Sequence, residues 1–406
     1  MSKLRVGLLN VAYSPNLGDG LIAECMRFGL TGGHADLEVV LIDLAGRDDF
    51  ATGLKKKQFY GAIQSALPPV LRRLAARVFL ELLIRSRLKA FYRGKMSQID
   101  ALVVGGGNLI ADHDLNFPKK IHAALEAARE RHLPVHIWAV GASAGWSKTG
   151  ARLFRDAFAR SDIRSISVRD ERSQQLLERL LPTAQKPLEV AVVPDPGLCA
   201  SLAVPASPPR SSANEAPPFA IGIMSAKELR YHGATALTND RLIQIYSSIA
   251  DEMLACGRRV NIFTNGNPDD REFAQRFMQF RENTGQGNPR LTDCSPEIQT
   301  PTDLCRFIQA QGGIVAFRMH AVVAAFSYRV PFVALMWDKK VVEFLKQIDK
   351  PDCLFEPHST SAADVVEALL AETSGVDSTR NAAAAREALT ELHRLARLIA
   401  TNHQAG

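Results

Sequence analysis

The sequence lacks the features that mark several large classes of protein. Its six cysteines form no CxxC pair, so neither a zinc site nor a disulfide framework is indicated. No apolar run approaches the roughly 20 residues that span a bilayer, and the N-terminus lacks the pattern of a signal peptide. The formal charge of +6 over 406 residues is too small to indicate nucleic-acid binding. We therefore expect a cytoplasmic protein that is not integral to a membrane and binds no nucleic acid.

Length and patterning predict two α/β domains. A chain of 406 residues exceeds the usual span of one hydrophobic core. Short apolar runs alternate with helical patterns on both sides of residues 204–218, a stretch rich in Pro, Ser and Ala that is typical of a linker. We predict two Rossmann-like domains facing a cleft, which is the GT-B-like layout. The predicted parts are an N-terminal domain (1–203), the linker (204–218), a C-terminal domain (219–375) and a C-terminal helix (376–406).

The first predicted strand, Leu4 to Leu9, is followed by a polar turn that contains Asn16, Gly18 and Asp19. The turn lacks the GxGxxG spacing of a dinucleotide site. A glycine here allows the backbone to approach a ligand closely. Asp19, near the start of the next helix, is either an N-cap or an acid that orients a substrate hydroxyl.

A later predicted strand, Asp100 to Val104, ends in glycines and an asparagine. These residues are Gly105, Gly106, Gly107 and Asn108. Three glycines at a strand end expose backbone amides to a phosphate or a sugar, although they equally suit a tight turn.

Asp112, His113 and Asp114 form the pattern that comes nearest to a metal site. Adjacent residues on a loop need not converge on one ion, and no partner cluster is evident. We interpret this run as an exposed loop and expect neither a metal nor a cofactor.

The stretch from Gly313 to Lys339 carries the strongest indication of chemistry. A buried-strand pattern, Ile314 to Phe317, is followed at once by Arg318 and His320, then by a helix of small residues and a second strand. Ligands of open α/β sheets bind beyond the carboxyl ends of strands, where a helix start offers unpaired amides to an anion. Arginine binds carboxylate or phosphate, and histidine exchanges protons near neutral pH. The pair indicates an acidic substrate; the alternative is that Arg318 forms a salt bridge with a helix and His320 is a cap.

A basic stretch interrupts the first domain. Residues 68–95 contain eight Lys or Arg and one acid, Glu81, within a predicted helical insertion, 55–98. Its apolar residues at helical spacing are Leu71, Leu74, Val78 and Leu82. Such a helix can lie in the surface of an anionic membrane, here the inner face, as a peripheral contact. Alternatively it packs between domains with its arginines in solvent.

Taken in order, several motifs resemble the polysaccharide pyruvyl transferase family over about residues 5–350. They are Asn16-Leu17-Gly18-Asp19, Gly105-Gly106-Gly107-Asn108, Val168-Arg169-Asp170 with Ser173, Asp195-Pro196, Arg318-Met319-His320-Ala321, Pro331 and Asp338-Lys339-Lys340. The resemblance implies transfer of pyruvate from phosphoenolpyruvate to two hydroxyls of a sugar in a surface polysaccharide or its lipid-linked precursor. A cyclic ketal forms and phosphate is released. The basic insertion and the tail beyond Gly375 depart from the family pattern.

Phosphoenolpyruvate carries a carboxylate and a phosphate, so its site needs at least two anion holders. Arg169 and Arg318 are the candidates, and His320 is the expected general acid at C3 of the enol. Asp19 or Asp195 takes the proton of the acceptor hydroxyl or orients the sugar. The other expected substrate-binding residues are Asn16, Gly18, Gly106, Gly107, Asn108 and Lys339.

Two rival functions fit the same layout. One is a GT-B glycosyltransferase that uses a nucleotide sugar, and the other is a non-catalytic protein of polysaccharide assembly that retains only the fold.

Overall fold

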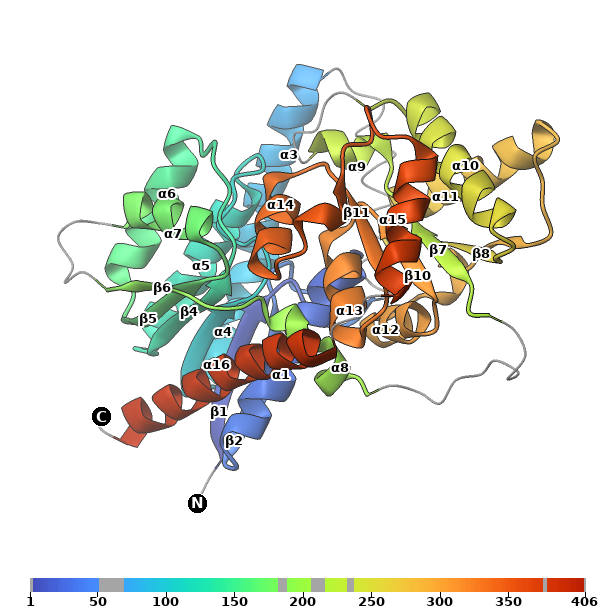
Figure 1. Cartoon of the computed structure of the whole chain (residues 1–406). Helices are drawn as coiled ribbons and strands as arrows, with labels where there is room; N and C mark the ends of the chain where they lie inside the picture. The colour runs from blue at the N-terminus through green and yellow to red at the C-terminus, as the bar shows by residue number, and fades with distance from the viewer. Residues whose placement is uncertain are drawn as a thin grey trace. The chain divides into compact units, whose positions relative to one another are not determined.

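The computed structural model describes residues 3–50, 69–181, 188–205, 216–231, 237–374 and 378–404. The chain divides into two compact units (Figure 1). The first unit comprises residues 1–14, 22–196 and 387–406, and the second comprises 15–21 and 197–386. The predicted linker lies mostly outside the described residues, as does the Lys55 to Lys57 part of the basic insertion.

The first unit contains a parallel six-stranded sheet in the order β2-β1-β3-β4-β5-β6. Its strands are β1 (Leu4–Asn10), β2 (Leu37–Asp43), β3 (Ala101–Gly105), β4 (Val135–Val140), β5 (Ile163–Val168) and β6 (Val190–Val192). The order reverses between β1 and β3, which makes their carboxyl ends the switch point where ligands of such sheets bind. Every residue of β3 and β4 is buried, as expected for parallel strands with both faces covered.

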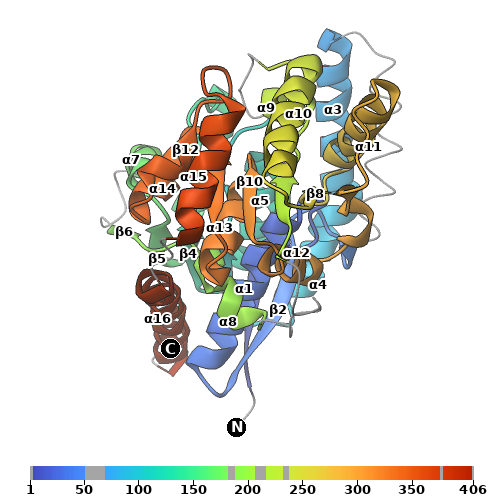
Figure 2. The same ribbon diagram turned by 45° about the vertical axis from the view of Figure 1, so that its right-hand side comes forward.

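Helices flank this sheet. They are α1 (Leu17–Gly33), α3 (Pro69–Leu83), the π-helix η1 (Ile84–Leu88), α4 (Lys89–Met96), α5 (Asn116–Glu130), α6 (Lys148–Arg160), α7 (Glu171–Leu180) and α16 (Ser378–Gln404). The last helix, α16, returns to pack on α1 (Figures 1 and 2): a Cβ added at Gly29 would lie 2.5 Å from Leu392. The close packing of these helices therefore depends on small residues in α1.

The second unit contains another parallel sheet, in the order β12-β11-β10-β7-β8-β9. Its strands are β7 (Phe219–Gly222), β8 (Val260–Phe263), β9 (Leu291–Asp293), β10 (Gly313–Ala316), β11 (Phe332–Leu335) and β12 (Leu354–Phe355). Counted within this unit, the order is 3-2-1-4-5-6, that of the Rossmann fold. Its switch point lies between β7 and β10.

The helices of the second unit are mostly short. They are η2 (Pro196–Cys199), α8 (Ala200–Ala203), α9 (Ala226–Tyr231), α10 (Asn239–Ala255), α11 (Pro268–Asn283), η3 (Ser295–Glu297), α12 (Pro301–Gln309), α13 (Met319–Tyr328), α14 (Lys339–Gln347), η4 (Pro351–Cys353) and α15 (Ala362–Ser374). Helix α10 packs with α15, and α12 packs with α13. The Tyr246 ring of α10 is buried and contacts Phe273, Phe277 and Phe317 edge-on or tilted. This aromatic cluster fixes Phe317, the residue that precedes Arg318.

The division into units differs from the predicted domains in three places. The boundary falls after Pro196 rather than at 203, and the turn Pro15–Leu21 groups with the second unit. The end of α16, from Glu387, groups with the first unit rather than standing apart as a C-terminal helix. The apolar pattern could not reveal these differences, because they depend on which distant segments the residues contact.

The basic stretch forms the continuous run α3, η1 and α4. The side chains packed against the core are Leu80, Ile84, Leu88, Tyr92 and Met96. Two residues of the apolar face predicted for this helix, Val78 and Leu82, lie outside the core and are 52% and 60% exposed. The side chains of Leu71 and Leu74 lie outside the described residues.

Of the six cations of this stretch whose side chains are described, five form ion pairs with carboxylates. The pairs are Arg77 with Asp114, Arg85 with Glu81, Lys89 with Glu126, Arg93 with Glu130, and Lys95 with Asp48. One side of the stretch therefore packs on the core of the first unit, while Val78 and Leu82 face outward. Within the described residues, no helix is long and apolar enough to cross a membrane.

Candidate functional site

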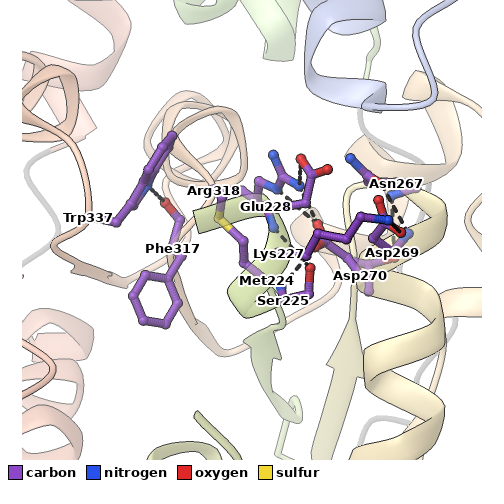
Figure 3. Close-up of polar contacts among 12 residues, drawn as sticks. Met224, Ser225, Lys227, Glu228, Asn267, Asp269, Asp270, Phe317, Arg318 and Trp337 are labelled. Carbon is purple, nitrogen blue, oxygen red and sulfur yellow. Dashed lines mark hydrogen bonds and ion pairs between the residues drawn. The ribbon is translucent and has the colours of Figure 1, made fainter. Parts of the chain in front are cut away.

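A buried cluster of charges surrounds Arg318 at the switch point of the second unit (Figure 3). Arg318 follows β10, is the N-cap residue of α13 and is 6% exposed. Its Nε donates to Oδ2 of Asp270 at 3.0 Å, and its Nη2 donates to Oε2 of Glu228 at 3.1 Å and also to Asp270. Asp270 lies in the first turn of α11, and Glu228 lies in α9. We call these three residues the charge triad.

The charge triad joins the ends of several elements. Oδ1 of Asp270 accepts a hydrogen bond from the backbone N–H of Ser225, just beyond β7, at 2.9 Å. Burial alone would lower the pKa of Arg318, but the two carboxylates outweigh it and raise the pKa, so the guanidinium stays charged. The structure therefore agrees with the alternative interpretation of Arg318, in which the residue forms salt bridges with helices, here α9 and α11. Its expected contact with a substrate anion stays a prediction.

The chain segment after β11 lies on the other side of the turn before α13. The indole N–H of Trp337 donates to the backbone carbonyl of Phe317 (Figure 3). Asp338 caps α14 by accepting from the N–H of Lys340 at 2.9 Å. Lys339 is exposed in the first turn of α14. Both sides of the β10–α13 turn are thus held by hydrogen bonds.

The start of α13 suits an anion. Its N-cap residue, Arg318, makes no side-chain capping hydrogen bond, so no side chain of the cap satisfies the N–H groups of the first turn. His320 lies in this turn and is partly exposed. A helix start that has no side-chain cap and carries a histidine can bind a phosphate or carboxylate and supply a proton.

The first loop of the chain, here Pro15 to Asp19 and so including the first residues of α1, approaches His320 closely. Leu17, beside Gly18, donates its backbone N–H to the carbonyl of Asn265 at 2.7 Å. A Cβ added at Gly18 would lie 2.6 Å from Cβ of His320 and 3.0 Å from its Nδ1. The structure therefore brings together the predicted Gly18 and His320, with Asn16 and Asp19 in the same tight turn.

A second polar cluster lies at the carboxyl edge of the sheet in the first unit. Arg169 follows β5 and Asp195 follows β6; both are buried, and Nη1 of Arg169 donates to Oδ2 of Asp195 at 2.9 Å. A Cβ at Gly141 would lie 2.9 Å from Nη2 of Arg169 and 3.0 Å from Oδ1 of Asn108. Three of the predicted substrate-binding residues are thus neighbours.

The glycines after β3 differ in their surroundings. Gly106 and Gly107 both have a positive φ of 71°, which favours glycine over any other residue. A Cβ at Gly106 would meet Ile22 at 2.3 Å, whereas one at Gly107 would meet nothing within 4 Å. Asn108 donates from Nδ2 to Oγ of Ser143 at 2.9 Å. The tight-turn interpretation accounts for the two glycines, and Gly107 in addition leaves open space above the strand.

In the run from Asp112 to Asp114, the carboxylate of Asp112 accepts hydrogen bonds from neighbouring protein groups. Oδ2 of Asp112 accepts from both the N–H and the hydroxyl of Ser147, and its Oδ1 accepts from the N–H of Leu115. In the part of the chain that the structure describes, no group of three or more metal-binding side chains is present.

Sequence reasoning missed Glu228, Asp270 and Asn265. The first two lie 90 and 48 residues from Arg318, and an acid in the first turn of a helix is common for electrostatic reasons alone. Asn265 follows β8 and is buried. Its place directly after a strand was the available indication, as it was for Arg318.

Comparisons with known proteins agree on family and fold. The family model for polysaccharide pyruvyl transferase matches residues 16–339. No curated protein sequence matches the chain significantly.

Three solved structures of similar fold are UDP-N-acetylglucosamine 2-epimerases or are described as such. The one from Listeria monocytogenes has a TM-score of 0.56 at 11% identity and covers 95% of this chain and 91% of its own. The one from Rickettsia bellii has a TM-score of 0.53 at 12% identity, covering 99% and 95%. The one from Methanocaldococcus jannaschii has a TM-score of 0.51 at 11% identity, covering 92% of each chain. At such identities the likeness shows the fold alone, which is the predicted α/β fold of the GT-B-like class.

Gly18→Ala should destabilise the protein through the contact with His320. A methyl group 2.6 Å from a Cβ atom forces the backbone apart, and overpacking of this kind costs about 1–3 kcal/mol. Gly94→Ala in α4 is the matched control, because its Cβ would meet nothing within 4 Å. It should raise the free energy of unfolding by about 0.5–1 kcal/mol. Urea denaturation measures the free energy of unfolding of both variants. Equal stabilisation of the two would show that the backbone at Gly18 moves to accept a methyl group without cost.

Arg318→Ala should lower the free energy of unfolding by about 3–5 kcal/mol, because it leaves two buried carboxylates uncompensated. Arg27→Ala removes an exposed pair with Glu24 and should cost less than about 1 kcal/mol. Both are measured by denaturant titration. If Arg318→Ala costs no more than the control, the charge triad does not hold this turn.

Proposed function

Because the chain belongs to the polysaccharide pyruvyl transferase family, we propose that it transfers pyruvate from phosphoenolpyruvate to two hydroxyls of one sugar. The observation that carries the proposal is His320 in the uncapped first turn of α13, in contact with the first loop of the chain at Gly18. The proposed acceptor belongs to a surface polysaccharide or its lipid-linked precursor.

The chemistry needs one acid and a site that holds the carboxylate and the phosphate of the donor. Protonation of the enol at C3 makes the methyl group and leaves positive charge at C2, which the first sugar hydroxyl attacks. The C2–O bond to phosphate then breaks, and the second hydroxyl adds at C2 to close the ketal. One hydroxyl proton replaces the proton given to C3, and the other leaves with the phosphate. The net reaction consumes no oxidant and no cofactor.

In this proposal the residues of the second unit have distinct tasks. His320 delivers the proton to C3, which is a contribution of about 10² to 10⁴-fold for a positioned acid. The N–H groups at the start of α13 hold an anionic group of the donor. Arg318 carries one positive charge against two carboxylates, so the triad as a whole is not cationic. Its geometry supports a positioning role for Arg318 rather than direct attraction of the donor.

The cluster of the first unit is proposed as a further substrate-binding surface. Arg169, Asp195 and Asn108 combine a cation, an anion and an amide at strand ends, a set of groups that binds saccharide hydroxyls and phosphate. Asp19 remains the proposed group that orients the acceptor hydroxyl near His320, and Lys339 a proposed contact of the donor.

His320→Ala should reduce phosphate release from phosphoenolpyruvate in the presence of acceptor by about 10² to 10⁴-fold. Stabilisation of the protein by phosphoenolpyruvate in a thermal-shift assay should remain, because the amides of α13 stay in place. His358→Ala, at an exposed histidine of the same unit, is the control and should release phosphate at the wild-type rate.

Near-normal release by His320→Ala would contradict the acid assignment. The rival functions have their own outcomes in the thermal-shift assay. Stabilisation of the wild type by a nucleoside diphosphate and not by phosphoenolpyruvate would indicate a glycosyltransferase, and stabilisation by neither would indicate a non-catalytic protein.

We also propose that α3 contacts an anionic membrane surface where a lipid-linked acceptor is presented. The supporting observation is the outward exposure of Val78 and Leu82, one turn apart and flanked by Arg77 and Arg85. Because both arginines are paired with carboxylates, the apolar side chains rather than the net charge supply most of the proposed affinity.

Val78→Gln with Leu82→Gln should therefore lower binding to phosphatidylglycerol vesicles roughly tenfold or more. Phe280→Gln, at an exposed aromatic of α11, is the control and should bind like the wild type. Vesicle co-sedimentation gives both values. Binding that survives the double change would show that the protein reaches its acceptor by another surface.

A further inference from the structure

Asn265 is a buried amide beside the proposed catalytic turn, and its side chain has no hydrogen-bond partner in the described part of the chain. The residue follows β8, and its side chain is 1% exposed. Among the described residues, neither its Oδ1 nor its Nδ2 has a hydrogen-bond partner. Burial of an unpaired amide is costly, and nearly all such groups in native proteins are satisfied by protein, water or ligand. The unpaired amide of Asn265 is therefore a candidate contact for a bound polar ligand.

The backbone around Asn265 is held tightly in place. Its carbonyl accepts the N–H of Leu17 at 2.7 Å. The next residue, Gly266, has a φ of 90°, and a Cβ there would lie 2.7 Å from Leu17 and from the carbonyl of Pro15. Arg271 donates from Nε to the carbonyl of Gly266 at 3.1 Å. A rigid loop that keeps a polar side chain unpaired is typical of a preformed binding site.

The same loop contacts place Asn265 next to the catalytic turn. Leu17 bonds to Asn265, and the adjacent Gly18 lies against His320. Two consecutive residues, Leu17 and Gly18, therefore link Asn265 to the proposed acid. Both belong to the second unit.

The chemistry of an amide distinguishes between the two substrates. An amide offers one donor group and one acceptor on neighbouring atoms. A phosphate or a carboxylate supplies only acceptors and would leave Oδ1 unpaired. Two hydroxyls of one sugar satisfy both atoms, because one hydroxyl donates to Oδ1 while the other accepts from Nδ2.

We propose that Asn265 binds the pair of sugar hydroxyls that the enzyme bridges, and so selects an acceptor with a correctly spaced diol. This inference rests on the proposed function. It makes Asn265 a determinant of acceptor specificity, distinct from the donor site at the start of α13.

The test compares Asn265→Leu and Asn265→Asp with wild type. Binding of methyl β-galactoside, methyl β-glucoside and methyl β-mannoside is followed by saturation-transfer NMR, which requires no turnover. Wild type should bind at least one glycoside. Both variants should bind it at least tenfold more weakly, because leucine offers no polar atom and an aspartate no donor. Stabilisation by phosphoenolpyruvate should be unchanged.

Asn261→Leu is the matched control. Asn261 lies within β8, the strand that precedes Asn265, and its Nδ2 donates to Oε1 of Gln311 at 3.0 Å, so its amide is already paired and is assigned to neither substrate. Asn261→Leu should retain glycoside binding. Asn265→Leu should fold with unchanged or raised thermal stability, since the change removes an unpaired buried amide. If Asn265→Leu does not fold, Asn265→Asp provides the second variant.

Several outcomes would overturn the inference. They are wild-type binding to none of the three glycosides, glycoside affinity retained in both variants, and loss of the phosphoenolpyruvate stabilisation together with glycoside binding. Failure of the proposed function is separate: wild type that binds a glycoside through Asn265 yet releases no phosphate from phosphoenolpyruvate would contradict pyruvyl transfer and leave the saccharide site intact.

Discussion

The geometry of the proposed site depends on one buried ionic interaction. The guanidinium of Arg318 is almost fully removed from solvent and contacts Asp270 and Glu228. Burying a single charge is strongly unfavourable, and a buried pair is tolerated only when its geometry and hydrogen bonds are good. Because the partners come from α9 and α11, the triad holds the beginnings of three helices against the ends of β7 and β10. The turn that carries His320 is consequently fixed before any substrate binds.

The charges of the triad suit Arg318 to positioning the turn before α13 rather than to binding an anionic donor. One guanidinium beside two carboxylates does not present net positive charge, so an anionic donor gains little from its proximity. The side chain of the cap residue bonds to the triad and makes no capping hydrogen bond to α13. An arginine at the N-cap position thus leaves its helix start without a side-chain cap. A serine or aspartate at this position would occupy the same amides with its own oxygen.

The sequence predicted the strands and the Arg318 turn well, because buried parallel strands are short apolar runs that end where polar residues begin. It did not reveal the partners of Arg318, since no local pattern encodes contacts across 48 and 90 residues. Across α3 and η1 two apolar stripes both have helical spacing, and only tertiary packing decides that Leu80 and Ile84 are buried while Val78 and Leu82 are exposed. Periodicity identifies a helix more reliably than its buried face.

Two glycines of the candidate site make room for polar side chains of the protein itself. Glycine at a strand end was expected to admit a ligand, but the close neighbours of these glycines are protein side chains. Gly18 is approached by His320, and Gly141 by Arg169 and Asn108. In each case the missing side chain gives space to a polar group that belongs to the candidate site. The glycine therefore determines where that group lies, and enlarging it would displace the functional residue even though the glycine itself touches no substrate. A strand that ends in glycine can thus indicate the position of a functional side chain on a neighbouring loop.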